Sequence, residues 1–272
     1  MCAQKLQFKV LEENMAIGGM ALLKKIALKD GSTAVLREMQ SSKLFSLSLR
    51  RRFQSGTRVR LTLSPHPNIV NSLERGSHFL TPYEIVDFVD GPSLRGLMSQ
   101  NDPTLKENAY NVLLEMAQAL AWVHQCGFMH LDVKPENFLL ERQGRSFTVK
   151  LTDFDLTRQK DDNGPRKQLG TPGFMAPEQF LQKLSYQASD VFAFGLIAYQ
   201  LLTGKHPFTG KTQKETWKHQ ASAQVLPRPI QEINPAVPSN LEFLVRNCLQ
   251  KNPAQRPQNM QQVLHALQQC RA

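Results

Sequence analysis

The sequence predicts a protein of the α+β class, in which a small β-rich part is followed by a larger, mainly helical part. Short β-type runs separated by turn signals occupy the first hundred residues. Beyond the string DGPSL at 90–94, apolar residues recur at helical spacing instead. With 272 residues, 41% of them hydrophobic, the chain is long enough for two lobes that share a cleft.

The β-rich part contains candidate strands that are short and rich in branched or aromatic side chains, as strands in globular proteins are. They are FKVL at 8–11, ALLKKIAL at 21–28, STAVLREM at 32–39 and YEIVDFV at 83–89. The strings KDGS at 29–32 and SPHPN at 64–68 supply turn residues between them.

The helical part contains three long segments with apolar residues on one helical face. They are KENAYNVLLEMAQALAWVHQ at 106–125, SDVFAFGLIAYQLL at 189–202 and NLEFLVRNCLQ at 240–250. The longest apolar run, VFAFGLIAYQLL from residue 191, is too short to span a bilayer. We therefore expect no transmembrane segment.

Cysteine usage bears on the compartment. Cys2, Cys126, Cys248 and Cys270 are scattered without C-x-x-C pairs, which indicates neither a disulfide framework nor a zinc site. The start of the chain has no basic region followed by an apolar stretch, so a secretory signal is not indicated. These observations favour a soluble protein of the reducing cytoplasm.

Positive charge is concentrated in one region. The formal net charge is +10, and residues 41–73 carry six basic side chains and no acidic one. A solvated basic helix face is one interpretation, and a docking surface at residues 50–60 for an acidic or anionic partner is the other. No zinc-finger, KH or RNP-type motif supports nucleic acid as that partner.

Several polar strings recur in a fixed order along the chain. They are HPNIV at 66–70, HLDVKPENFLL at 130–140, KLTDFDLTR at 150–158, GTPGFMAPE at 170–178, SDVFAFG at 189–195 and NPAQRP at 252–257. Together they resemble the signature of Ser/Thr protein kinases, close to the bacterial Hanks-type group. The resemblance implies one domain over residues 1–272 with a bilobal kinase-like fold. Its N-lobe would be about 1–88, its hinge about 87–93 and its C-lobe about 94–272.

The resemblance implies transfer of the γ-phosphate of ATP to a protein Ser or Thr. In this reaction the protein mainly positions the reactants and stabilises charge. Asp132 would accept the proton of the substrate hydroxyl, and Lys134 would contact the γ-phosphate. Asn137 and Asp153 would hold Mg²⁺, or Mn²⁺, because such ions prefer hard oxygen ligands. The segment FLL after Asn137 would be a short strand that anchors this loop.

Further residues receive roles from the same resemblance. The nucleotide would contact Gly18, Gly19, Leu23, Val35, Arg37, Asp87, Val89 and Leu139, with Leu139 beneath the adenine. Glu178 and Arg256 would form a buried ion pair, and Asp190 would bind the backbone of the catalytic loop.

The nucleotide grip departs from the family pattern. The string AIGGMA at 16–21 stands in place of G-x-G-x-x-G, and Arg37 stands where a lysine normally holds the phosphates. Active kinases pair that lysine with a helix glutamate, yet no acid occurs between Glu38 and Glu74. Lys24 or Lys25, in the second candidate strand, could substitute for the missing lysine, although an exposed strand lysine is the simpler interpretation.

Regulation also departs from the pattern. Leu131 stands where many kinases have an arginine that receives an activation-loop phosphate, and Thr157 is the only hydroxyl side chain between Asp153 and Gly170. We therefore expect activity that does not depend on such phosphorylation. Asp155 replaces the glycine of D-F-G; a place near the metal is one interpretation, but we expect its side chain to be exposed to solvent. The departures leave two functions open: a protein kinase, or a pseudokinase that acts as a nucleotide-binding or scaffold module.

Overall fold

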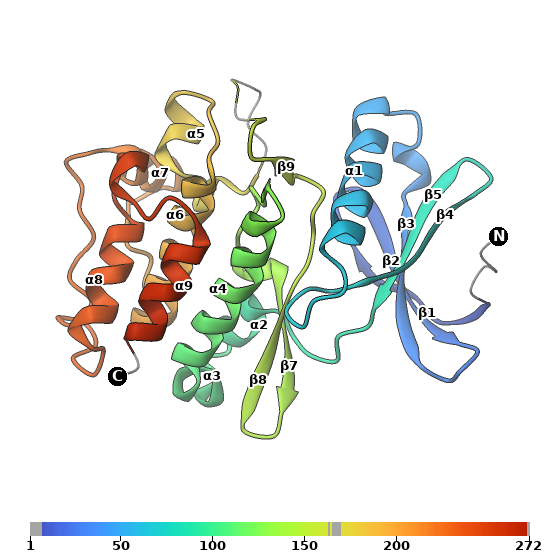
Figure 1. The fold of residues 1–272 in the computed structure, drawn as a ribbon, viewed down its shortest axis with the longest axis horizontal. Coiled ribbons are helices and arrows are strands. Elements are labelled where there is room, and N and C mark those ends of the chain that lie inside the picture. The colour runs from blue at the N-terminus through green and yellow to red at the C-terminus, as the bar shows by residue number, and fades with distance from the viewer. Residues whose placement is uncertain (1–6, 163, 165–169, 271–272) are drawn as a thin grey trace. The chain divides into compact units, whose positions relative to one another are not determined.

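The computed structural model describes residues 7–162, 164 and 170–270. Their contacts divide the chain into two compact units (Figure 1). The β-sheet unit comprises the described residues up to Asp90 together with Asp153–Asp155. The helical unit comprises Gly91–Thr152 and the described residues from Leu156 onward. The α+β class predicted from the sequence is confirmed.

The β-sheet unit is built on an antiparallel sheet with the strand order β1-β2-β3-β5-β4. Its strands are β1 (Phe8–Ile17), β2 (Ala21–Leu28), β3 (Thr33–Met39), β4 (Ser72–His78) and β5 (Thr81–Asp87). All four predicted strand segments belong to it, and β4 was not predicted. One sheet face carries a core of Ile26, Ala34, Leu36 and Ile85.

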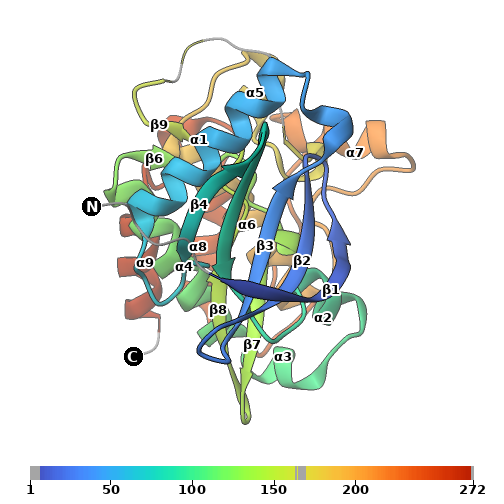
Figure 2. The ribbon, with the colours of Figure 1, turned by 90° about the vertical axis from the view of Figure 1, so that its right-hand side faces the viewer.

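A single long helix, α1 (Leu47–Leu63), accompanies this sheet and packs against β4 and β5 (Figure 2). Its buried positions include Phe53, Gly56, Arg60 and Leu63, which recur every three or four residues and so lie on one helical face. The basic region at residues 50–60 is therefore part of a helix with arginines at its surface. Arg60 is different, because it faces the interior and is fully buried.

The helical unit contains most of the helices. They are α2 (Leu94–Ser99), α3 (Pro103–Glu107), α4 (Ala109–Gln125), α5 (Pro177–Leu181), α6 (Gln187–Thr203), α7 (Gln213–Ala221), α8 (Ser239–Cys248) and α9 (Met260–Gln269). The three predicted helices correspond to α4, α6 and α8. Helix α6 is apolar on all sides because α4, α8 and α9 surround it (Figure 1). Among the described residues, no helix is both long and apolar enough to cross a membrane.

Two short antiparallel ladders complete the helical unit. Strand β7 (Phe138–Gln143) pairs with β8 (Ser146–Leu151), and β6 (Phe128–Met129) pairs with β9 (Arg158–Gln159). The predicted FLL strand is the start of β7, where Phe138 and Leu140 are fully buried. Since β6 ends just before residue 130 and β7 begins at Phe138, the polar loop between them is anchored at both ends.

Candidate functional site

The loop between β6 and β7 has an unusual backbone that is held from the core. Leu131 has a φ of 65°, in the left-handed region that non-glycine residues rarely adopt. Asp190, in the first turn of α6, accepts hydrogen bonds from the backbone nitrogens of His130 at 2.7 Å and Leu131 at 2.8 Å. The role predicted for Asp190 is confirmed, and these two bonds stabilise the strained conformation.

His124 is a further anchor that sequence reasoning missed. Its Nε2 lies 3.0 Å from Asp190 Oδ2, and its Nδ1 accepts a hydrogen bond from the backbone of Met260 at 3.0 Å. Because Nδ1 is an acceptor, Nε2 carries the proton and donates to Asp190. His124 therefore joins α4 and the start of α9 to the residue that holds the loop. Its place near the end of the apolar stripe of α4 was the available signal.

Asp132, Lys134 and Asn137 lie together on this loop. Lys134 Nζ is 2.6 Å from Asp132 Oδ2, and Asn137 Nδ2 donates to the same oxygen at 3.2 Å and to the Asp132 carbonyl at 2.8 Å. Thr171 Oγ1 donates to Asp132 Oδ1 at 3.3 Å, a contact that was not predicted. Lys134, Asn137 and Thr171 thus all donate to the carboxylate oxygens of Asp132.

The orientation of Asn137 suits a metal ligand. Its donations to Asp132 both use the amide nitrogen, and no described residue donates to its Oδ1. No group of three or more His, Cys, Asp or Glu side chains suitable for a metal occurs in the part of the chain that the structure describes. Mg²⁺ commonly takes only one or two protein oxygens and completes its shell with phosphates and water. The amide oxygen of Asn137 and the carboxylate of Asp153 are each of the ligand type that such an ion accepts.

Some of the predicted nucleotide residues of the β-sheet unit lie on the same face of the sheet. Leu23 pairs across the ladder with Arg37, and Val35 lies two residues before Arg37 on β3. Residues paired across strands, or two apart on one strand, point to the same side. Leu23, Val35 and Arg37 therefore lie on one face. Gly18 and Gly19 lie in the β1–β2 turn, where the Gly18 nitrogen donates to the Ala21 carbonyl at 2.9 Å.

The remaining predicted nucleotide residues are divided between the two units. Asp87 ends β5, and its Oδ2 accepts from Asn71 Nδ2 at 2.9 Å. Val89 is 7% exposed in the same unit. Leu139, in β7 of the helical unit, forms an isolated bridge with Ser93.

Arg37 is the centre of a buried ion-pair network in the β-sheet unit. Its Nη1 lies 2.7 Å from Glu84 Oε2 on the neighbouring strand β5, and its Nη2 lies 2.9 Å from Asp155 Oδ2. Arg60 Nε approaches Glu84 Oε1 at 3.2 Å from α1. The prediction that Asp155 is exposed was wrong: its side chain is only 9% exposed, because Arg37 binds it.

Burial and charge shift the titration of this network in opposite directions. Burial lowers the pKa of Arg37, but the nearby carboxylates Asp155 and Glu84 outweigh it and raise that pKa. Burial raises the pKa of Glu84, but the charges of Arg60 and Arg37 outweigh it and lower that pKa. Burial raises the pKa of Asp155, and the charge of Arg37 only partly offsets it. Arg37 and Glu84 are consequently held in their charged forms.

Lys24 and Lys25, the alternative cations, have partners of their own. Lys24 Nζ is 2.9 Å from Glu13 and 3.4 Å from Glu38, and the Lys25 Nζ lies 4.1 Å from the centre of the Phe88 ring. The hydrogen bond to Glu13 is the main reason that the pKa of Lys24 is raised. Both lysines therefore already have partners: Lys24 contacts Glu13 in β1 and Glu38 in β3, and Lys25 contacts Phe88.

Two structural predictions for the helical unit are settled. Arg256 Nη1 and Nη2 contact the two carboxylate oxygens of Glu178 at 2.9 and 2.8 Å, so the predicted buried ion pair is confirmed. Thr157 is buried and donates to the His130 carbonyl at 3.3 Å. It is thus unsuited to accept a phosphate, as predicted. Residues 163 and 165–169 of the segment between Asp153 and Gly170 lie outside the described residues.

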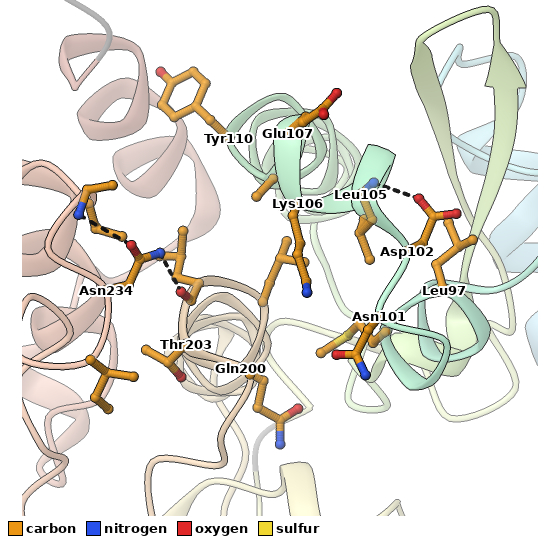
Figure 3. A pocket seen from close by; sticks show the side chains of 18 of the residues that line it. Leu97, Asn101, Asp102, Leu105, Lys106, Glu107, Tyr110, Gln200, Thr203 and Asn234 are labelled. Atoms are coloured by element: carbon orange, nitrogen blue, oxygen red, sulfur yellow. Dashed lines mark hydrogen bonds between the residues drawn. The ribbon is translucent and has the colours of Figure 1, made fainter.

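A cavity lies elsewhere in the helical unit (Figure 3). It has a volume of about 900 Å³ and is lined by α2, α3, the start of α4, the end of α6 and the segment before α8. Asn234 on its wall donates to the Leu202 carbonyl at 2.9 Å, and Asp102 accepts from the Leu105 nitrogen at 2.9 Å. None of the predicted site residues lines it, so we do not assign the reaction to this cavity.

The profile of the protein kinase domain matches residues 12–267. The chain belongs to the protein kinase family. The resemblance stated from the motifs is thus confirmed, and the loop that contains Asp132 and Asn137 lies within the matched residues.

Kinase relatives with curated names come from several bacteria. The chain is 32% identical to the serine/threonine-protein kinase PkaA of Streptomyces coelicolor, over 85% of this chain and 42% of that protein. It is 32% identical to Pkn1 of Myxococcus xanthus, over 88% of this chain and 34% of the relative. It is 30% identical to PknB of Mycobacterium tuberculosis, over 91% of this chain and 40% of the relative. The chain therefore spans less than half the length of these relatives.

Proposed function

We propose that this chain is a serine/threonine protein kinase that transfers the γ-phosphate of ATP to a hydroxyl of a protein substrate. The observation that carries the proposal is the catalytic loop, where Lys134 and Asn137 both bind the Asp132 carboxylate and Asp190 fixes the backbone. The similar bacterial proteins, which are named as serine/threonine-protein kinases, support the same substrate class.

Each side chain has a chemical task in this proposal. Asp132 accepts the proton of the attacking hydroxyl. Lys134 contacts the Asp132 carboxylate in the structure and would contact the transferred phosphoryl group during the reaction. Asn137 and Asp153 hold Mg²⁺, or Mn²⁺, which supplies charge neutralisation at the phosphates. In the same assignment residues 1–88 are the N-lobe, 87–93 the hinge and 94–272 the C-lobe of one domain. We also propose a reducing cytoplasm as the compartment, because Cys126, Cys248 and Cys270 are unpaired.

Labelling tests this function. The purified chain is incubated with γ-labelled ATP, Mg²⁺ or Mn²⁺ and a generic basic protein substrate. Asp132→Asn should reduce the rate at least ~10²-fold, because one well-placed electrostatic group is typically worth that much. Asp161→Asn, at an exposed turn of the same unit, is the matched control and should not change the rate. Equal labelling by wild type and Asp132→Asn would contradict the proposal.

A binding module without phosphate transfer is the second candidate. It is favoured by Arg37, whose two terminal nitrogens are both bound by carboxylates. Calorimetry separates the candidates: nucleotide binding without turnover supports the module, and turnover that depends on Asp132 excludes it. In either case, the basic region at 50–60 is a proposed docking surface for an acidic protein segment.

That docking surface has a groove of about 400 Å³ in the β-sheet unit, lined among others by Arg50, Arg58 and Arg75. Binding of an acidic peptide there should weaken steeply as salt increases. A peptide affinity that Arg50→Ala and Arg58→Ala leave unchanged would contradict it.

A further inference from the structure

Two departures from the kinase pattern meet at one contact. Arginine replaces lysine at position 37, and aspartate replaces glycine at position 155. The structure joins these two side chains at 2.9 Å, although 118 residues separate them in the chain. Arg37 uses its other terminal nitrogen for Glu84 at 2.7 Å. An arginine has a planar fork that can bind two acids at once in fixed directions, whereas an ammonium group is a point charge without such a fork.

The backbone around Asp155 is packed as closely as its side chain. A Cβ added to Gly56, in the middle of α1, would lie 3.0 Å from both the Cα and the nitrogen of Asp155. Real Cβ atoms are rarely so close to a backbone, so only glycine at position 56 lets the segment lie where it does. Glycine is otherwise unfavourable inside a helix. The segment Asp153–Asp155 is thus held by a side-chain ion pair on one side and by direct contact with α1 on the other.

We propose that Asp155 is a positioning residue that replaces the helix acid of the kinase pattern. It holds one arm of Arg37, and through that contact it fixes both the β3 cation and the segment that carries the proposed metal ligand Asp153. The inference rests on the proposed function for its catalytic consequence, but the ion pair and its effect on the segment can be measured without any turnover.

The first experiment measures amide hydrogen exchange in the peptide that spans residues 152–157, on the full chain without nucleotide. Asp155→Asn keeps the shape but removes the charge, and it should speed exchange of these amides by about tenfold, a typical coupling for directly paired groups. Arg37→Met should give a similar increase. In the Arg37→Met background, Asp155→Asn should add less than about twofold, because the partner is already gone.

The matched control is Asp30→Asn. Asp30 lies in the exposed β2–β3 turn of the same unit and accepts hydrogen bonds from Ser32, which an asparagine can also accept. This variant removes the same charge without touching Arg37, and it should leave exchange at 152–157 unchanged.

Gly56→Ala tests the proposal with every charge retained, in case removal of a buried charge unfolds the unit. The added methyl group should displace the segment and speed exchange at 152–157, although alanine favours the helix itself. Ser55→Ala, at the adjacent exposed position of α1, is its control. Equal exchange in wild type, Gly56→Ala and Asp155→Asn would overturn the inference.

Kinetics supplies the catalytic arm. If the chain transfers phosphate, Asp155→Asn should lower kcat/KM for ATP by about 10- to 100-fold, the usual effect of losing a residue that orients a functional group. The loss should not add to that of Arg37→Met. If the variants change amide exchange as expected but the wild type transfers no phosphate, the proposed function is wrong and the ion-pair role of Asp155 stands. If the wild type transfers phosphate at a rate that Asp155→Asn and Gly56→Ala do not change, the proposed function stands and the positioning role of Asp155 is wrong.

Discussion

Asp190 binds the backbone nitrogen of Leu131 with one carboxylate oxygen and that of His130 with the other. Both bonds are buried, and Leu131 is in the left-handed region. One side chain in the first turn of α6 therefore determines the conformation of the loop that follows β6. The loop depends on this residue more than on its own sequence, because a left-handed leucine is unfavourable by itself.

Asp190→Asn tests this dependence. An asparagine has only one acceptor oxygen, so at least one of the two backbone nitrogens would lose its partner. We expect a loss of ~1–3 kcal/mol in the free energy of unfolding, the usual result of leaving one buried polar group unsatisfied. Urea denaturation measures it, and Asp161→Asn is the exposed control in the same unit. An unchanged midpoint would show that the loop does not need Asp190.

The ion pair of Glu178 with Arg256 should be far more important than an exposed pair. Their side chains are 1% and 0% exposed, so removing one partner leaves a buried charge. Glu178→Gln should cost ~3–5 kcal/mol. Glu232→Gln breaks the Arg228–Glu232 pair, whose side chains are 60% and 55% exposed, and should cost ~1 kcal/mol or less. Comparable losses in the two variants would contradict the importance of burial here.

Gly195 allows close packing between α6 and α8. A Cβ at this position would lie 2.8 Å from the Cβ of Cys248 and 3.2 Å from a methyl carbon of Leu249. Gly195→Ala should therefore destabilise the helical unit by ~1–3 kcal/mol through overpacking. Gly96→Ala in α2 is the matched control, since its nearest neighbours would be 3.6 Å away. It should stabilise by up to ~1 kcal/mol through helix propensity, and thermal unfolding of both variants measures the difference.

Lys251 should make stability depend on pH. Burial lowers its pKa from 10.5 to about 7, and the charge of Arg256 contributes in the same direction. Between these two values the unfolded chain holds a proton that the folded chain lacks, so the free energy of unfolding should rise with pH in this window. Below pH 7 both states are protonated and this contribution is at its minimum. Lys251→Met should remove the rise.

Urea titrations of wild type and Lys251→Met at several pH values between 6 and 10.5 check this dependence. The Nζ of Lys251 lies 3.3 Å from the centre of the Phe208 ring and donates to the Gln220 carbonyl at 2.8 Å. These contacts favour the charged form of Lys251. If the difference in free energy of unfolding between wild type and Lys251→Met stays constant across this pH window, the two contacts outweigh burial.

The sequence predicted the parts of the fold that carry a clear periodicity. The strands with branched side chains and the helices α4, α6 and α8 were found in this way. Strand β4 was not, because Ser72–His78 (SLERGSH) is an edge strand with few strand-favouring residues. Ordered motifs predicted that Asp132, Lys134 and Asn137 act together on one loop, and the structure brings these three side chains into contact.

The surroundings of Arg37 could not be predicted in the same way. Its partners Glu84 and Asp155 lie 47 and 118 residues further along the chain, and neither belongs to the helix where the pattern places an acid. Only the strand register, which sets Glu84 directly opposite Arg37, reveals the first contact. The buried Arg60 did carry a signal, since it recurs with Phe53 and Leu63 on the inner face of α1.

The position of Glu84 has a mechanical consequence. Strand β5 is flanked by β3 and β4, so its backbone is secured by ladders on both edges. A displaced α1 would release Arg60 from Glu84, but Arg37 and Glu84 would travel together as neighbours in one sheet. When the acid lies on the helix, an outward movement of the helix separates the charged partners. Here the same movement of α1 cannot separate Arg37 from Glu84.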